Sequence, residues 1–373
     1  MKARMLLLLL GLAASPAAAE PARLRFLNGS SEPVQVFWLN NGERVPRGIL
    51  EPGRDRMENT TLGHGFVLVG SKSGTEFSVR SEVRHQAFRF DPPSPTGVPA
   101  FYTQQVSVGG FPIVASAKVN PYALKEAAYL AGQMLAQRPD VRDAMVRSGA
   151  RLCILAHNEF TTDQPEWEWL AHEPVTGLPR VNSRDYRDAR ARGMGGSLTD
   201  PYCSCAEENL LGYPGDPYEA ECIFIHEFAH NMHLRGLTNV DPTFDARLKA
   251  AYDAAMQAGL WTGKYASVNP HEYFAEGVQS WFDNNRENDH DHNHVNTRAE
   301  LLEYDPGLAA LCREVFGDTV LQYTKPATRL TGHLQGYDPA GAPTFRWPER
   351  LQSMRDEIRR RAQERDRQAN APK

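Results

Sequence analysis

The stretch that decides the fold of this chain spans residues 223–230 and reads Ile223-Phe224-Ile225-His226-Glu227-Phe228-Ala229-His230. It places an HExxH pattern inside an apolar run, which predicts a buried helix. Histidines four residues apart lie on one helical face, so both imidazoles can reach one Zn2+. The glutamate between them is placed to act as a base toward a zinc-activated water. A pair of buried, satisfied histidines is the alternative, but it does not explain a glutamate in an apolar run.

The residues before the motif predict where this helix begins. Asp216 is a candidate N-cap, Pro217 suits the first helical position, and Glu219 stands three residues after Asp216 as in a capping box. Gly236 is placed to end the helix. These signals predict a helix that starts at Asp216 and carries both histidines in its middle.

The same helix does not supply a third ligand. Cys222 shares a face with the two histidines, but it lies about 12 Å from His230 along the axis, at about 1.5 Å per residue. The longer pattern HExxHxxGxxH is also excluded, because His233 occupies its glycine position and Gly236 its third histidine position. The third ligand must therefore come from another segment.

A second capped segment, Asn269-Pro270-His271-Glu272, offers that ligand. Asn269 and Pro270 predict a helix start, and Glu272 and Glu276 share one face of the helix. Glu272 stands where a capping-box glutamate would, so capping its own helix is the competing role. Glu276 repeats the acid one turn later among apolar residues, where capping explains nothing. Both glutamates have a role if one carboxylate binds the metal and the other accepts a hydrogen bond from the second ring N–H of a ligand histidine.

HExxH followed by Tyr265 and, seven residues later, Glu272-Tyr273-Phe274-Ala275-Glu276 resembles the catalytic core of the lethal-factor-like zinc metallopeptidases, which are of the gluzincin type. The resemblance covers about Asp216 to Phe282. It implies a zincin-like metallopeptidase domain in which each motif residue has a role. The implied zinc ligands are His226, His230 and Glu272, the general base is Glu227, the phenol near the reacting carbonyl is Tyr265, and the acid supporting a ligand is Glu276.

The first residues of the chain are typical of a secretory signal peptide, residues 1–19. Lys2 and Arg4 precede a leucine-rich run, and Ala17-Ala18-Ala19 gives a cleavage site. An uncleaved membrane anchor is the alternative, but the apolar stretch is too short to span a bilayer comfortably. We therefore predict a secreted or periplasmic protein.

Residues 20–90 predict a small all-β sandwich. The runs Val34–Leu39, Gly65–Val69 and Glu76–Val79 are β-branched or aromatic and are separated by Asn-Gly, Pro-Gly and Ser-Gly turn signals. Proline-rich residues 91–100 predict a linker. A second domain at residues 101–347 and a charged tail at residues 348–373, helical or disordered, complete the expected organisation.

This β module resembles the β-domain of the von Hippel-Lindau tumour suppressor. The matching segments are Phe26-Leu27-Asn28, Val36-Phe37-Trp38-Leu39-Asn40, Leu50-Glu51-Pro52-Gly53 and Gly63-His64. The resemblance implies a pocket for a hydroxylated proline, which Thr60 and His64 suit. Arg47 and Phe66 stand where that family has a tyrosine and a tryptophan. A folded spacer or a protein-binding module of unknown ligand is the favoured interpretation.

Composition limits the partners. The chain has 41 Lys and Arg against 46 Asp and Glu, a net charge of −5, which argues against nucleic acid or a membrane as a partner. Five cysteines leave at least one unpaired, and in an exported protein we expect one or two disulfides. Cys203 and Cys205 are too closely spaced for a usual zinc site, so a disulfide or buried thiols are expected there.

The rest of the second domain reads as mostly helical. Helices are predicted from Pro121, at Pro139–Arg147 and from Asp241-Pro242 to about Gly259, with one strand at Arg151–Ala156. Residues 163–217 show little periodicity and predict loops that wall a cleft. The segment Asp289-His290-Asp291-His292-Asn293-His294 is interpreted as a polar loop near that cleft, with a second metal site as the alternative.

The sequence thus predicts a multidomain protein, a small all-β sandwich followed by a mostly α (α+β) zincin-like metallopeptidase domain. Its expected function is a secreted zinc-dependent endopeptidase with Zn2+ as cofactor and a peptide or protein as substrate. A protein ligand of the β module is a further candidate partner. The alternatives are a zinc hydrolase of a non-peptide amide or ester, and a non-catalytic binding protein with a structural zinc.

Overall fold

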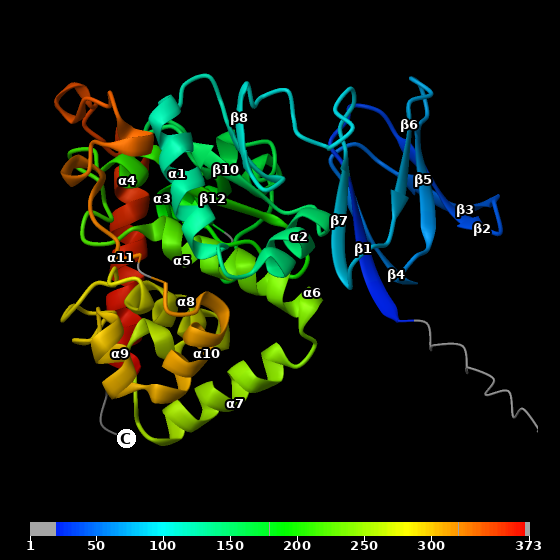
Figure 1. The fold of residues 1–373 in the computed structure, drawn as a ribbon. Coiled ribbons are helices and arrows are strands. Elements are labelled where there is room, and N and C mark those ends of the chain that lie inside the picture. The colour runs from blue at the N-terminus through cyan, green and yellow to red at the C-terminus, as the bar shows by residue number, and fades with distance from the viewer. Residues whose placement is uncertain (1–19, 179, 320, 370–373) are drawn as a thin grey trace, which may run out of the picture.

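A computed structural model describes residues 20–178, 180–319 and 321–369. The predicted signal peptide lies outside the described residues. A region of β-strands comes first, and a larger region of helices around a sheet follows it (Figure 1). This order agrees with the predicted succession of an all-β and an α+β region.

The first region consists of two sheets that share one core. Its strands are β1 (Pro21–Asn28), β2 (Val34–Asn40), β3 (Glu43–Leu50), β4 (Asp55–Thr61), β5 (Gly65–Gly70), β6 (Glu76–Arg80) and β7 (His85–Phe90). One sheet has the order β4-β1-β7 and the other the order β3-β2-β5-β6. Leu24 and Phe26 of the first sheet pack with Val36 and Leu68 of the second. The three strand segments predicted here are confirmed as β2, β5 and β6.

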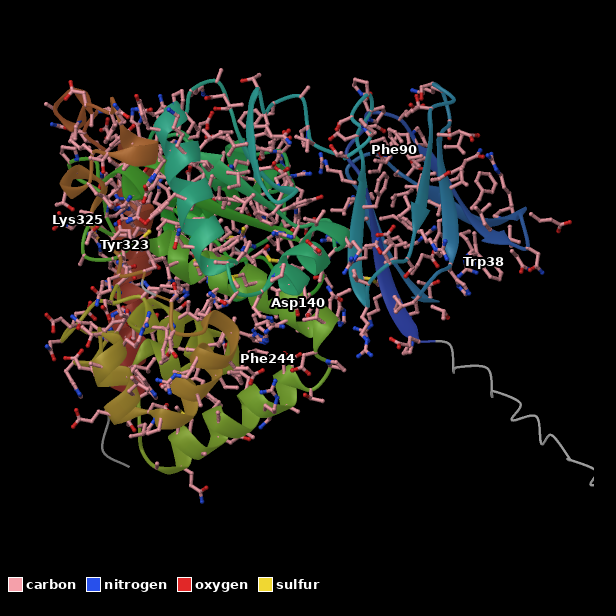
Figure 2. The ribbon with its side chains drawn as sticks, in the orientation of Figure 1. Trp38, Phe90, Asp140, Phe244, Tyr323 and Lys325 are labelled. Carbon is pink, nitrogen blue, oxygen red and sulfur yellow. The ribbon has the colours of Figure 1, made fainter. Side chains whose placement is uncertain are left out.

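Turn chemistry sets the register of the second sheet. Asn41 and Gly42 take positive φ angles of 51° and 87°, as the short turn between β2 and β3 requires. The alternation within the strands then points Val34 and Val36 inward. Figure 2 shows Trp38 and Phe90 in this region, and Phe90 is fully buried.

The β region is attached to the larger region by hydrogen bonds as well as by the chain. The β7 residues His85 and Ala87 donate their backbone N–H groups to Asn239 Oδ1 at 2.8 Å and to Ser148 O at 3.0 Å. From β1, the Arg25 side chain donates to Thr199 O at 2.8 Å. These contacts fix the orientation of the β module.

A five-stranded sheet forms the centre of the larger region. Its strands are β8 (Gln104–Val108), β9 (Phe111–Ala115), β10 (Arg151–Leu155), β11 (Gly193–Met194) and β12 (Tyr202–Ala206). The order is β11-β12-β10-β9-β8, and β10 is parallel to both β9 and β12. The predicted strand at Arg151–Ala156 is confirmed as β10. The other four were not predicted, and β12 lies inside the stretch interpreted as loops.

The central strands β9, β10 and β12 are buried on both faces, which explains why β9 and β12 were hard to recognise from the sequence. Leu152 and Ile154 face the main core, whereas Cys153 between them packs with Tyr202 on the opposite face. A strand buried on both sides shows no apolar and polar alternation. On the main-core face, Phe111 of β9 lies 5.4 Å from Phe228 of the metal-motif helix, ring centre to ring centre.

The helices of the larger region surround this sheet and continue into a second helical layer (Figure 1). They are α1 (Pro121–Met134), α2 (Pro139–Arg147), α3 (Ser183–Arg190), α4 (Glu207–Leu211), α5 (Ile223–Asn231), α6 (Thr238–Val240), α7 (Phe244–Gln257), α8 (Pro270–Trp281), α9 (Arg298–Tyr304), α10 (Pro306–Phe316) and α11 (Glu349–Ala369). Of the predicted helices, α1, α2, α7 and α8 are confirmed. In Figure 2, Asp140 lies at the start of α2 and Phe244 at the start of α7.

The charged tail forms the helix α11, but its first turns are not free in solvent. Leu351 is fully buried against Phe160 and Ala189. Arg350 forms an ion pair with Asp188 of α3 at 2.8 Å. The beginning of the tail is therefore part of the folded domain, and residues 370–373 lie outside the described residues.

The expectation of disulfides is wrong for this structure. All five cysteines are free thiols and all are buried. Strand geometry prevents a disulfide between Cys203 and Cys205. Residues two apart on a strand lie on the same face with Cα atoms about 7 Å apart, which is too far for a disulfide. Both thiols pack into the main core, as does Cys222.

No described helix combines the length and the apolar character that crossing a membrane requires.

Candidate metal centre

The helix α5 carries the HExxH motif, but it begins later than predicted. It starts at Ile223, and Asp216 to Glu219 form turns instead of a first helical turn. Asp216 accepts a hydrogen bond from Tyr218 N at 3.0 Å, which is a local turn contact.

Distant asparagines satisfy the N–H groups at the start of α5. Cys222 N donates to Asn284 Oδ1 at 2.8 Å, and Ile223 N donates to Asn209 Oδ1 at 2.8 Å. These partners lie far away in the sequence. No local pattern could therefore have shown that the helix is capped at residue 222.

The predicted end of the helix at Gly236 is also wrong. The chain continues from α5 through a π-helical turn, Met232–Leu237, into α6. Gly236 faces α2 so closely that an added Cβ would clash with the Val141 side chain. The glycine is therefore used for close helix packing and not for a left-handed cap.

The helix α8 begins as predicted and supplies Glu272. The Asn269 side chain accepts hydrogen bonds from His271 N at 2.8 Å and Glu272 N at 3.0 Å. With these N–H groups capped by Asn269, the Glu272 side chain turns toward α5. Its Oε2 atom lies 3.1 Å from His226 Nε2 and 3.1 Å from His230 Nε2. Of the two roles considered for Glu272, this geometry favours the ligand.

Three candidate ligand atoms thus converge on one point. His226 Nε2 and His230 Nε2 are 3.1 Å apart, and these atoms and the Glu272 carboxylate lie within 4.8 Å of one another. Ligands about 2.0–2.1 Å from a tetrahedral zinc are about 3.3 Å from each other, so the spacing suits that ion. Two imidazoles and a carboxylate are also a usual ligand set of catalytic zinc. Burial alone would raise the pKa of Glu272, but the two histidines lower it below its usual range.

Glu227 projects from α5 beside this cluster, under a glycine-rich segment. A Cβ added at Gly195 would lie 2.9 Å from Glu227 Oε2 and 2.6 Å from His230 Cβ, and one added at Gly193 would lie 2.9 Å from Glu227 Cγ. Burial raises the pKa of Glu227 to about 7. The edge strand β11 and Gly195 therefore cover the predicted base, a contact that the sequence did not reveal.

Tyr265 lies beside His226. It begins a short 3-10 turn, and its ring centre is 6.1 Å from that of His226. The side chain is 37% exposed, so solvent reaches it. Burial and the carboxylates of Glu272 and Glu227 raise its pKa, which keeps the phenol protonated near neutral pH.

Side chains of α8 contact Nδ1 of His226, the ring nitrogen that does not face the other candidate ligands. Its Nδ1 atom lies 2.8 Å from Gln279 Oε1 and 3.4 Å from Glu276 Oε1. The structure places Glu276 beside a candidate ligand, where it was predicted. Gln279 was missed, although its position seven residues after Glu272 puts it on the same face of the helix.

The Asp289–His294 segment, all of which the structure describes, does not form the second metal site that was considered for it. Among the described residues, no further group of three metal-ligating side chains converges on one point. The segment instead contacts Glu276, through His292 Nε2 at 3.3 Å.

In the β module, Thr60 Oγ1 lies 3.0 Å from His64 Nδ1, so the two residues suggested for a ligand pocket contact each other. Phe66 is 2% exposed and belongs to the module's core, so it lines no open pocket. Arg47 pairs with Glu58 at 3.0 Å. The ligand of this module stays a prediction.

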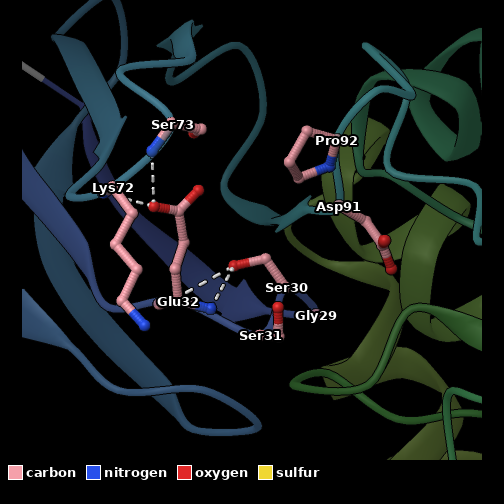
Figure 3. A pocket seen from close by; sticks show the side chains of 8 residues that line it. All are labelled: Gly29, Ser30, Ser31, Glu32, Lys72, Ser73, Asp91 and Pro92. Atoms are coloured by element: carbon pink, nitrogen blue, oxygen red, sulfur yellow. Dashed lines mark hydrogen bonds between the residues drawn. The ribbon is translucent and has the colours of Figure 1, made fainter.

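A pocket of about 530 Å³ lies at the edge of the β module near Asp91 and Pro92 (Figure 3). The Glu32 carboxylate in it accepts hydrogen bonds from the backbone N–H groups of Lys72 and Ser73. A second pocket, of about 420 Å³, includes His157 and Glu207. Neither pocket is lined by the converging histidines of the candidate metal centre.

A comparison of the sequence with protein-family models gives no match, and a search of curated proteins also finds none. Function is therefore inferred from the residues and their geometry.

Proposed function

We propose that this chain is a zinc-dependent endopeptidase whose metal is held by His226, His230 and Glu272. The observation that carries the proposal is the convergence of these three side chains beside the partly buried Glu227 and beside Tyr265. The motif resemblance to lethal-factor-like peptidases assigns the same five positions. Secretion of the protein is part of the proposal and rests on residues 1–19 of the sequence.

Glu227 suits the role of general base. A carboxyl group with a pKa of about 7 is present in both protonation states near neutral pH. It can take a proton from the attacking water and later deliver that proton to the leaving amine. A bound zinc would supply Lewis acidity, which polarises the scissile carbonyl and acidifies water.

Tyr265 suits the role of a donor to the developing oxyanion. Its raised pKa keeps the hydroxyl protonated, and its partial exposure leaves it accessible to a substrate. The tyrosine approaches His226 from a segment separate from α5 and α8. A carbonyl placed between Tyr265 and Glu227 would then face a donor and a base.

The ligand count argues against a purely structural zinc. Structural sites usually close around the ion with four protein ligands, whereas catalytic sites keep three and leave one position for water or substrate. Among the described residues, the converging group has three members. The same residues would serve hydrolysis of a non-peptide amide or ester, so substrate class is decided by experiment.

The test compares zinc-loaded wild-type protein with the variant Glu227→Gln. Both are incubated with a diverse peptide library and with a panel of simple amides and esters, and products are identified by mass spectrometry. We expect wild type to cleave internal peptide bonds and the variant to lose about 10²- to 10⁴-fold in kcat. The control is zinc content, which we expect to be the same in both proteins, because the substitution leaves the three ligands unchanged.

Three results would overturn the proposal. Cleavage confined to the non-peptide panel would establish the alternative hydrolase. Equal peptide cleavage by wild type and Glu227→Gln would show that this site is not responsible, and no turnover of any substrate would favour the binding protein.

A further inference from the structure

The segment that follows α8 reaches back to the candidate metal centre. We call residues 286–292 the His292 loop. His292 is buried and lies between two carboxylates, with Nδ1 2.8 Å from Asp289 Oδ1 and Nε2 3.3 Å from Glu276 Oε2. Because both neighbours only accept hydrogen bonds, His292 must donate from both nitrogens. Burial alone would lower its pKa, but the contact with Glu276 raises it.

One chain of contacts runs from the metal centre to this loop through Glu276. Glu276 Oε1 faces His226 Nδ1 at 3.4 Å, and its Oε2 atom faces His292 and accepts from Asn285 Nδ2 at 2.9 Å. Glu276 itself is 3% exposed. A buried carboxylate needs such partners to stay charged, and His292 is the cationic one on the side away from His226.

A second series of contacts reaches the same loop through Gln279. Gln279 Oε1 lies 2.8 Å from His226 Nδ1, and Gln279 Nε2 donates to Glu221 Oε2 at 2.7 Å. Glu221 Oε1 pairs with Arg286 Nε at 3.1 Å, and Arg286 Nη1 pairs with Asp289 Oδ2 at 3.3 Å. Asp289 then contacts His292, so the two series of contacts close into a ring on the Nδ1 side of His226.

This ring decides which nitrogen of His226 faces the metal position. Gln279 donates through Nε2 to Glu221, so its Oε1 atom is left to accept. Glu276 also accepts, so Nδ1 of a neutral His226 must carry the hydrogen. The lone pair is then on Nε2, which points at His230 and Glu272. Partners of this kind fix the tautomer and orientation of a ligand histidine.

The same loop also holds the segment that carries Tyr265. Tyr265 N donates to Asp291 O at 2.8 Å, and Lys264 Nζ donates to Asp289 O at 2.9 Å. The His292 loop therefore contacts both sides of the centre, the ligand side through Glu276 and the phenol side through the backbone.

We propose that His292 is a positioning residue that anchors Glu276 behind His226, so that the His292 loop sets the metal affinity of the centre. This proposal rests on the zinc site of the proposed function but not on hydrolysis. It gives the loop a role that neither a second metal site nor an uninvolved polar loop provides.

The test measures zinc affinity by competition with a chromophoric chelator in wild type, His292→Ala, His292→Gln and the matched control His294→Ala. His294 belongs to the same histidine-rich segment but is exposed and makes an edge-to-face contact with Tyr304, with ring centres 5.4 Å apart. We expect His292→Ala to raise the zinc Kd about 10- to 100-fold, as loss of a ligand-orienting partner does. The control should stay within about twofold of wild type, because its change lies outside the ring.

His292→Gln can still donate to Glu276 but loses Asp289, so it should recover most of the loss, leaving a Kd about 2- to 10-fold above wild type. The visible spectrum of the protein saturated with Co2+ adds a readout that a general loss of stability would not move. We expect a changed spectrum for His292→Ala and an unchanged one for His294→Ala.

Equal zinc affinities and cobalt spectra for His292→Ala and His294→Ala would overturn the proposal. If His292→Ala does not fold, Asp289→Asn decides, because Asp289 is partly exposed and its replacement still removes one carboxylate partner of His292. An unchanged zinc Kd in Asp289→Asn would then refute it. If affinities shift as expected but wild type hydrolyses nothing, the positioning role stands and the proposed function fails.

Discussion

Three histidines on one continuous helical run have different partners. His226 and His230 lie on α5, and His233 lies in the π-helical turn that follows; their exposed fractions are 9%, 8% and 0%. His226 and His230 turn their Nε2 atoms toward each other and toward Glu272. His233 Nε2 instead meets Asp245 Oδ1 at 2.7 Å, and its ring packs on Phe274.

The difference shows that burial alone does not identify a ligand. All three imidazoles are inside the protein, and each is close to a carboxylate. What separates them is that two Nε2 atoms share one point with a third donor, whereas the Nε2 atom of His233 has a single partner of its own. Several lone-pair atoms that converge on one point, without a separate hydrogen-bond donor for each, are typical of a cation site.

The comparison is tested most strongly by removing one histidine of each kind. We expect His230→Ala to raise the zinc Kd by more than about a hundredfold, because a lost ligand costs more than a lost supporting partner. We expect His233→Ala to keep zinc affinity within a few-fold of wild type. Isothermal titration with zinc gives both numbers. A similar loss of affinity in the two variants would remove the distinction.

Zinc should also stabilise only the protein that keeps the site. At a zinc concentration of 100 times Kd, ligand linkage adds about 2.7 kcal/mol to the free energy of unfolding. We expect this gain in wild type and in His233→Ala, and its absence in His230→Ala, as shifts in the urea midpoint. The His233→Ala variant should start from a lower stability, because it leaves a cavity beside Phe244 and Phe274.

A smaller effect is expected from crowding His230 without replacing it. Gly195→Ala would place a methyl group 2.6 Å from His230 Cβ and 2.7 Å from His230 Cδ2, so the imidazole must shift. We expect zinc affinity to fall about tenfold with the fold intact. Gly132→Ala in α1 is the control, because its added Cβ meets nothing closer than 3.9 Å. If Gly195→Ala binds zinc as wild type does, β11 and Gly195 do not hold His230 in place.

The smallest effect concerns Asp245, the partner of His233. The hydrogen bond with His233 lowers the pKa of Asp245, and the neighbouring His271 and His85 also act to lower it, against burial, which raises it. A depressed folded pKa gives stability that is present above the unfolded value of about 3.9 and is lost as the pH falls through the folded value.

Asp245→Asn should therefore be less stable than wild type at pH 7, with a difference that shrinks as the pH falls below about 4. Urea unfolding at pH 7, 5 and 3 measures this gap. A gap that stays constant across these pH values would show that the His233 contact does not depend on the Asp245 charge.

Local signals in the sequence sufficed for the ligands but not for their support. The spacing of His226 and His230 follows from helical geometry, and the Asn269-Pro270 start places Glu272 one turn into α8. The same reasoning failed at Asp216-Pro217, which has an equally good start signal. There the Asp216 side chain bonds within a turn, and Asn209 and Asn284 cap α5 from elsewhere.

The remaining features depend on contacts between distant segments. His292 meets Glu276 across a loop, and Gly195 covers Glu227 because β11 pairs at the edge of the sheet. The sheet itself escaped prediction where its strands are buried on both faces, as at Tyr202–Ala206. Periodicity records which side of an element is buried, and it carries no information on what the element will touch.

The five buried thiols can report on local unfolding of this molecule, because each becomes reactive only when the structure around it opens. An alkylating reagent reaches none of them while the chain stays closed, because each side chain is inside the core. Cys203 and Cys205 report on the central strand β12, Cys222 on the first residue before α5, and Cys312 on α10. The order in which these thiols become labelled over hours at neutral pH would map which layer separates first, and whether the helix with the histidines detaches before the sheet beneath it.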